Sequence, residues 1–563
     1  MGRPNKLQPR RVGANRRDFF MKSGSAAIAL AALPLSPLRA ASSIAELGVV
    51  FQHGVASGDP LIDRVILWTR VTPPSANAAV LVDYIVASDA ALTQVVARGR
   101  TKTFADRDHT VKVDALGLRP GTTYYYRFSA LGNSSPIGRT KTLPVGSPDR
   151  LRMAVVSCSN HAYGYFNAYR RIAERSDLDL VVHLGDYLYE YGAGEYGSAR
   201  TPEPATEMLS LADYRARHAQ YKRDADSQAM HRQHAFVAIW DDHEIANDSW
   251  IDGAQNHTPA SEGNYAQRVA AGLKAYYEWM PIRPVDTNQL RRNQRNFRFG
   301  DLVELLMLEE RLSARSQQLL ATIPIPGLGQ GFVQTGEFAN PARTLLGNDQ
   351  EAGLATRLRS TPARWKLLGQ GVMFAQLKGV AAANAAGGGV FLNSDQWDGY
   401  QPARNRIYEI IKGNPDHPAI NNVVVLTGDL HSSWAADLTQ DPNNPDLNSG
   451  GYNPVTGSGS RAVEFVGTSV TSPGIDTDTN GAIAGFLRSV NPHFKYINLH
   501  QRGYMLLDVT AQRAVCEWWH VDTVASLSNI ETFSIAFEVQ NGGNRLVASA
   551  QTTPRTNPPV PAP

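Results

Sequence analysis

The stretch LVVHLGDYLYEY, residues 180–191, ends an apolar run with a Gly-Asp pair at Asp186, and it decides the expected fold. The stretch VVVLTGDLHSSW, residues 423–434, repeats the arrangement at Asp429 and adds His431 two residues later. Glycine permits a sharp turn at the end of a buried strand, so the aspartate that follows projects over the strand end. One such pair is common as a turn or helix cap, but two after apolar runs are a stronger signal. They predict buried strands that deliver metal ligands to one edge of a sheet.

The chain downstream of residue 150 alternates apolar runs with helical patterns. The runs MAVVSC, FVAIWDD and VVVLTGD do not alternate in polarity, which is typical of strands buried on both faces. Segments 163–175 and 264–279 have helical spacing. We expect an α/β sandwich over residues 150–540, with its site at the carboxyl ends of the strands.

Other segments differ from this pattern. Residues 46–145 contain short β-branched and aromatic runs between Pro, Gly and Asp turns, such as LRPGTTYYYRF. This predicts an N-terminal fibronectin III-like β-sandwich. Residues 541–563 end in TTPRTNPPVPAP and are expected to be disordered. Polar insertions at 313–360 and 376–400 are expected to form loops on the substrate side.

The composition excludes several classes of protein. A formal net charge of +3 over 563 residues is too small a bias to indicate nucleic-acid binding. No run of 18 apolar residues occurs, so no membrane span is expected in the mature chain. The two cysteines, Cys158 and Cys516, allow at most one disulfide. Because their local contexts differ, we expect two separate thiols.

Residues 1–40 are typical of an export signal rather than of a folded element. Arg16 and Arg17 stand two residues before a pair of aromatic residues, and an apolar run follows from Ala26 to Leu35. This resembles a twin-arginine signal peptide, with a basic flexible terminus as the alternative. We therefore expect the twin-arginine translocation machinery as a partner and a periplasmic or secreted location.

Two further side chains bear on the identity of the metal. Cys158 ends the run VVSC, where a thiolate would reach the same cluster; a small buried hydrophobic residue is the alternative. Tyr189 lies three residues after Asp186. A phenol with a pKa of about 10 loses its proton only beside a strong Lewis acid, so a tyrosine ligand points to Fe³⁺. The alternating tyrosines of DYLYEY also fit an aromatic core face.

The run WDDHEIAND, residues 240–248, places Asp242, His243 and Asn247 directly after another apolar strand. So many acidic groups together are costly unless cations neutralise them. Carboxylate and amide oxygens suit Ca²⁺, Mg²⁺ or Mn²⁺. Arg268, on the following Ala-rich helix, is a candidate clamp for a phosphate oxygen, with an exposed helix arginine as the alternative.

Together these motifs resemble the PhoD-like alkaline phosphatases, a branch of the calcineurin-like metallophosphoesterases, over roughly residues 50–540. The matching motifs stand in the family's order: HGVASGDP (53–60), Cys158, Asp186 with Tyr189, WDDHE, Arg268 with AYYEWMP (275–281), Asp429 with His431, and EFVGTSVTSPG (464–474). The chain departs from the family's pattern at Glu309 and Asp248, which leaves its substrate range open.

The resemblance implies a metallophosphoesterase-type α/β sandwich that holds two kinds of metal. Fe³⁺ is expected on Cys158, Asp186, Tyr189 and His431. Two Ca²⁺ ions are expected on ligands that include Asp186, Asn247 and Asp429, with Asp242 near them.

The expected function is hydrolysis of phosphate esters by an exported metal-dependent phosphatase. A hydroxide or oxide on the metals would attack phosphorus in line, Arg268 would hold the remaining oxygens, and His243 would assist the leaving group. Phosphodiesterase or phospholipase D-type activity on lipids or cell-wall polymers is the first alternative. A non-catalytic exported protein that binds a surface polymer through its β-sandwich is the second.

Overall fold

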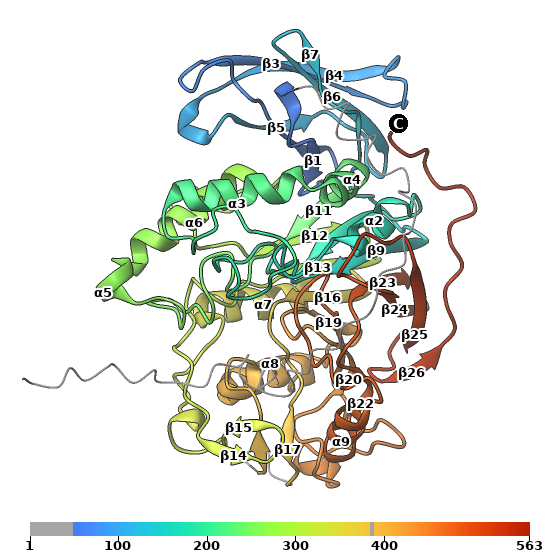
Figure 1. Cartoon of the computed structure of the whole chain (residues 1–563). Helices are drawn as coiled ribbons and strands as arrows, with labels where there is room; N and C mark the ends of the chain where they lie inside the picture. Colours follow the sequence, from blue (N-terminus) through green and yellow to red (C-terminus); the bar gives the residue numbers. More distant parts are fainter. Residues whose placement is uncertain (1–48, 383–387) are drawn as a thin grey trace, which may run out of the picture.

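Two β-sheets packed face to face form the centre of the molecule (Figure 1). The structure is a computed structural model that describes residues 49–382 and 388–563. The expected signal peptide at residues 1–40 lies outside the described residues. None of the helices in the described ranges is long and apolar enough to cross a membrane.

The larger sheet has ten strands within the described residues, and its centre is parallel. In spatial order the strands are β26 (Leu546–Ser549), β25 (Glu531–Gln540), β24 (Arg513–Val521), β23 (Gly503–Thr510), β9 (Arg150–Val156), β10 (Leu180–His183), β11 (Ala235–Ala238), β1 (Val55–Gly58), β2 (Arg64–Arg70) and β5 (Thr110–Leu116). The carboxyl ends of β9, β10 and β11 therefore lie at one edge.

The smaller sheet has seven strands in the part of the chain that the structure describes. In spatial order they are β12 (Arg295–Phe299), β13 (Val303–Met307), β16 (Trp365–Gln370), β19 (Val423–Thr427), β21 (Ala462–Val466), β20 (Ser433–Leu438) and β22 (Phe494–Asn498). Strands β13, β16, β19 and β21 are parallel to one another.

Helices cover the outer face of each sheet. Those beside the larger sheet are α2 (Asn167–Ala173), α3 (Leu211–Arg223), α4 (Ala225–Gln233) and α6 (Tyr265–Trp279), with the short α5 (Pro259–Glu262) preceding α6. Those beside the smaller sheet are α7 (Gly347–Ser360), α8 (Gln401–Lys412) and α9 (Ala482–Val490). In β19, Val423 and Val425 pack toward the helices, and Val424 and Leu426 pack between the sheets. This confirms the predicted α/β sandwich of fully buried strands.

Short elements fill the connections. They are η1 (Val49–Phe51), η2 (Ala105–Arg107), β14 (Ile323–Ile325), β15 (Gly329–Gly331), η3 (Gly336–Ala339), β17 (Lys378–Val380), β18 (Val390–Phe391), η4 (Trp397–Tyr400) and η5 (Leu447–Ser449). Several of them belong to the insertions at 313–360 and 376–400.

The N-terminal region forms the β-sandwich that the sequence predicts, but it shares a sheet with the rest of the protein. One layer contains β4 (Val95–Thr103), β3 (Val80–Ala87), β6 (Thr123–Ala130), β7 (Asn133–Ser134) and β8 (Gly138–Lys141). The other layer consists of β1, β2 and β5, which continue the larger sheet because β1 pairs in parallel with β11. The two regions predicted on either side of residue 145 are therefore consecutive in sequence, but strands from both belong to one continuous sheet.

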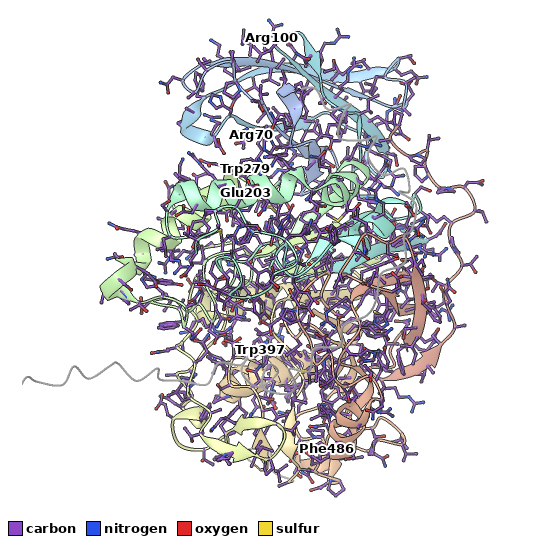
Figure 2. All side chains as sticks on the ribbon, in the orientation of Figure 1. Arg70, Arg100, Glu203, Trp279, Trp397 and Phe486 are labelled. Atoms are coloured by element: carbon purple, nitrogen blue, oxygen red, sulfur yellow. The ribbon has the colours of Figure 1, made fainter. Side chains whose placement is uncertain are left out.

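Aromatic packing closes the junction between the β-sandwich and α6. The indole nitrogen of Trp68 donates to the carbonyl oxygen of Glu278 at 2.9 Å, and its ring lies 5.7 Å from that of Trp279. Figure 2 shows Arg70 beside Trp279, with its guanidinium carbon 5.5 Å from the ring centroid. The sandwich and the α/β region thus share a buried contact as well as a sheet.

The C-terminal segment makes specific contacts, contrary to the disorder expected over residues 541–563. Its first part is β26, and the rest runs along the side of the molecule to the β-sandwich (Figure 1). Gln233 and Ala562 exchange two hydrogen bonds of 2.9 Å through the side-chain amide and the backbone. The Tyr125 hydroxyl donates to the carbonyl oxygen of Val560 at 2.6 Å. The prolines of this segment lack an amide donor, but the segment keeps its carbonyl acceptors and the amides of residues such as Ala562, so its composition alone does not exclude such docking.

We expect Gln233→Ala to lower the free energy of unfolding by about 1–2 kcal/mol, since it removes both hydrogen bonds to the C-terminal segment. Removing residues 554–563 is expected to lower it further. Thermal unfolding followed by circular dichroism measures the effect. Gln289→Ala, at an exposed position, serves as the matched control. Equal melting temperatures for the two alanine variants would contradict the assigned role of the segment.

Candidate metal centre

The site lies where the parallel strands of both sheets end. Cys158 follows β9, Asp186 follows β10, and Asp241 and Asp242 follow β11 in the larger sheet. Asp429 follows β19 in the smaller sheet. Because these carboxyl ends meet at one edge of the sandwich, residues far apart in sequence become neighbours.

A first cluster brings together a thiol, a carboxylate, a phenol and an imidazole. Ligand atoms of Cys158, Asp186 and His431 all lie within 4.8 Å of one another. The Tyr189 hydroxyl lies 3.2 Å from Asp186 Oδ2 and 3.1 Å from His431 Nε2. These are the four residues for which the family resemblance implies iron. Cys516 is buried in β24 and both cysteines are free, as expected.

A second cluster is formed by carboxylates. Oxygen atoms of Asp186, Asp241, Asp242 and Asp429 lie within 4.8 Å of one another, and Asp186, Asp242 and His243 form an overlapping group. Asp186 therefore belongs to both clusters, as a bridging ligand would. Asp241 was not among the predicted ligands, although it stands next to Asp242 in the WDDHE run.

The backbone at these positions adopts a rare conformation. Cys158, Asp186, Asp429 and His431 have φ angles of 60°, 54°, 60° and 55°. Left-handed φ values are uncommon for residues other than glycine, and they concentrate at functional sites. Gly185, with a φ of 104°, has no room for a side chain, since a Cβ there would lie 2.4 Å from the Cβ of Asp241.

The imidazole of His431 is oriented for coordination through Nε2. Its Nδ1 lies 2.7 Å from the carbonyl oxygen of Pro473. A carbonyl oxygen only accepts, so Nδ1 carries the hydrogen and Nε2 keeps its lone pair toward Tyr189. Ser472 Oγ lies 2.8 Å from the Tyr189 hydroxyl oxygen and 3.1 Å from the Cys158 carbonyl oxygen, both within hydrogen-bonding distance. The 472–473 segment thus holds three of the candidate ligands.

The electrostatics of the first cluster fit a strongly acidic metal ion. Burial, reinforced by the Asp186 carboxylate, raises the pKa of the Cys158 thiol and of the Tyr189 phenol well above their usual values. Both groups are therefore neutral on their own, and a Lewis acid is needed to hold them as anions. Sulfur, phenol, carboxylate and imidazole donors together could hold a metal ion at this place.

His243 and Asn247 are connected through Glu190. His243 Nδ1 lies 2.5 Å from Glu190 Oε2, and the backbone amide of Asn247 donates to Glu190 Oε1 at 2.8 Å. Asn247 also donates through its side chain to Gln255 at 2.8 Å. The structure thus places His243 with Asp186 and Asp242, and it links Asn247 to His243 through Glu190; a ligand role for Asn247 stays a prediction.

Arg268 is buried, so the alternative of an exposed helix arginine is wrong. Its guanidinium donates to Glu207 at 2.6 Å, to the Asn256 carbonyl oxygen at 2.9 Å and to the Tyr214 hydroxyl at 3.1 Å. Burial raises the pKa of Glu207 to about 7. To hold a phosphate oxygen, Arg268 would have to exchange one of these partners, so the clamp stays a prediction.

Sequence reasoning missed residues that hold the site together. Glu244 accepts from the backbone amides of Asp186 (3.1 Å), Tyr187 (2.6 Å) and Asp241 (2.8 Å), which ties the β10 and β11 loops together. Burial raises its pKa to about 8. Arg311, on the loop after β13, forms ion pairs with aspartates of the second cluster. The run LMLEER, an apolar strand followed by charged residues, carries the same signal as the other site segments.

The insertions at 313–360 and 376–400 reach the edge of the site. The first was expected to be a loop but ends in the helix α7, and a substrate-side role for both insertions stays a prediction. Gln396 donates to Asp429 Oδ2 at 2.6 Å, and Gln318 donates to the Asp248 carbonyl oxygen at 3.2 Å. Asp429 and His431 keep 6% and 8% of their surface exposed, whereas the other cluster members are at 2% or less. The residual exposure of the two clusters is therefore on the residues that follow β19 of the smaller sheet.

Comparison with known proteins agrees with this geometry. The model of the PhoD-like phosphatase family matches residues 153–518, and that of the family's N-terminal domain matches residues 39–144. Alkaline phosphatase D of Bacillus subtilis (strain 168) is 38% identical over 474 residues, covering 82% of this chain and 76% of that protein. A solved structure described as "Structure of PhoD" has a TM-score of 0.77 at 35% identity and covers 90% of this chain and 94% of its own. The chain therefore belongs to the PhoD-like phosphatase family.

Proposed function

We propose that this phosphoesterase is an exported, metal-dependent alkaline phosphatase that hydrolyses phosphate esters. The observation that carries the proposal is the convergence of Cys158, Asp186, Tyr189 and His431 at the strand ends. The curated relative is named alkaline phosphatase D, which supports a phosphatase over a non-catalytic binding protein. Export rests on the twin-arginine motif within residues 1–40 and would deliver the enzyme to the periplasm or the cell exterior.

The two clusters favour different metals. The first cluster, with its sulfur, phenol and imidazole donors, would hold Fe³⁺. The second cluster offers only carboxylate oxygens and the neighbouring Asn247 amide, which suits the two Ca²⁺ ions implied by the family. Asp186, Asp242 and Asp429 would be the calcium ligands, with Asp186 shared with iron.

The protein's own residues would position the phosphate and manage the proton. Fe³⁺ and Ca²⁺ supply, when bound, the Lewis acidity that activates water and neutralises phosphate charge. Arg268 would bind a non-bridging phosphate oxygen by giving up its contact with Glu207. Glu190 holds His243 through Nδ1, and Nε2 lies on the side of Asp242, 4.0 Å from its Oδ1. From this position Nε2 would deliver a proton to the leaving oxygen.

We expect Asp186→Asn to reduce kcat for p-nitrophenyl phosphate by at least about 100-fold, because both metal sites lose their shared charge. The melting temperature is expected to stay close to that of the wild type. Asp416→Asn, in an exposed turn, is the matched control and keeps full activity. Parallel assays with bis-p-nitrophenyl phosphate separate monoesterase from diesterase or phospholipase D-type activity. Near-normal turnover by Asp186→Asn would end the proposal.

Tyr189→Phe is expected to abolish a visible absorption band, since phenolate-to-Fe³⁺ charge transfer requires the deprotonated hydroxyl. Tyr196→Phe removes a hydroxyl that lies 3.4 Å from His431 Nδ1, outside the donor set, and should keep the band. Visible spectra with iron analysis of both variants provide the measurement. A wild-type protein that contains iron yet is colourless would refute phenolate ligation.

Chelation is expected to separate the two metals. EGTA should remove calcium and most activity while the visible band persists, because the thiol, phenol and imidazole are not calcium ligands. Added Ca²⁺ should then restore activity. Full activity after verified removal of calcium by EGTA would exclude a calcium requirement.

A further inference from the structure

A buried arginine lies within the acidic cluster. The Arg311 side chain is fully buried, and its Nε forms an ion pair with Asp241. One terminal nitrogen lies 3.5 Å from Asp429 Oδ1 and 3.8 Å from Asp242 Oδ1. The other lies 2.9 Å from Asp395 Oδ1. A single guanidinium therefore contacts three of the four carboxylates in the second cluster.

These carboxylates come from different sheets. Asp241 and Asp242 follow β11 of the larger sheet, whereas Asp429 follows β19 of the smaller sheet. Arg311 thus bridges the two halves of the sandwich at the point where they share a site. A planar guanidinium with five donors can serve several carboxylates in fixed directions, whereas a lysine ammonium acts as a compact point charge.

The backbone that carries Arg311 is itself fixed. The Glu309 carboxylate accepts from the amides of Arg311 (2.9 Å), Leu312 (2.7 Å) and Ser313 (2.8 Å). The same carboxylate accepts a hydrogen bond of 2.8 Å from the indole of Trp240, the residue that directly precedes Asp241 in the chain. The loop after β13 and the loop after β11 are therefore held to each other, and Arg311 extends from a rigid base.

The second oxygen atoms of Asp429 and Asp242 also accept hydrogen bonds. Asp429 Oδ2 accepts from the Gln396 amide at 2.6 Å, and Asp242 Oδ2 accepts from the backbone amide of Asp248 at 2.6 Å. Asp242 and Asp429 therefore have a hydrogen-bond donor on Oδ2 and the Arg311 guanidinium on the side of Oδ1, so both carboxylates are restrained from two sides. Geometry of this kind decides whether oxygen ligands suit a given cation.

We propose that Arg311 is a positioning residue for the divalent-cation site formed by Asp186, Asp241, Asp242 and Asp429. It sets the spacing between the aspartates of the two sheets, and it acts on the second cluster rather than on the iron ligands. The inference rests on the proposed metal-dependent function. If Arg311 only neutralised charge, any cationic side chain at this position would be sufficient. Positioning instead requires the planar guanidinium, whose donors point in fixed directions.

Arg311→Lys tests this distinction because it keeps the positive charge but replaces the planar guanidinium with an ammonium group. Calorimetric titration of EGTA-treated, iron-loaded protein with CaCl₂ is expected to show a calcium Kd raised by roughly 10- to 100-fold. Iron content and the visible band are expected to match the wild type. A wild-type calcium Kd in Arg311→Lys would overturn the proposal.

Arg404→Lys is the matched control. Arg404 is equally buried and lies 2.7 Å from Asp398, and its ion pair involves neither Asp395 nor the second cluster within the described residues. The calcium Kd of this control is expected to equal that of the wild type. An equal loss of calcium affinity in both variants would mean a general effect of replacing a buried arginine and would also overturn the proposal. If Arg311→Lys fails to fold, Asp395→Asn, which weakens the anchor of Arg311, is titrated with the same expectation. A wild-type protein that binds neither calcium nor iron would refute the proposed function, and not this inference specifically.

Discussion

One carboxylate, that of Asp186, belongs to both ligand clusters, and much of the local structure serves to keep it there. Its backbone is in the left-handed region, where a φ of 54° is unfavourable for an aspartate. Glu244 compensates by accepting hydrogen bonds from Asp186, from the next residue and from Asp241. Gly185 leaves the space that Asp241 needs. The strand ends of β10 and β11 therefore form one rigid support beneath a shared ligand.

The sequence predicted the parts of the site that follow directly from strand chemistry. Apolar runs that end in Gly-Asp or Asp-Asp indicate buried parallel strands, and parallel strands bring their carboxyl ends to one edge. Cys158, Tyr189 and His431 could therefore be assigned to a common cluster, helped by the family resemblance. Glu244 and Arg311 could not, because their roles depend on contacts between loops of different strands. Charged residues after a strand look alike in sequence whether they bind a ligand or support one.

The same limit applies to the fold. Short β-branched and aromatic runs between turn residues predicted the N-terminal β-sandwich, but no local pattern shows that β1 pairs with β11. Pairing between distant strands is decided by the packing of whole layers, here including Trp68 and Trp279. The C-terminal segment escaped detection for a related reason, since its acceptors bind donors supplied by Gln233 and Tyr125 from elsewhere in the chain.

The continuous hydrogen bonding from β11 into β1 has a mechanical consequence. Two globular parts joined by a linker can swing about it, but a shared sheet allows only elastic twisting. The β-sandwich therefore has a fixed orientation toward the strands that carry the site. Removing the β-sandwich would take β1 away and uncover the edge of β11, and a bare edge strand invites intermolecular pairing. The catalytic part is thus not an independently separable unit.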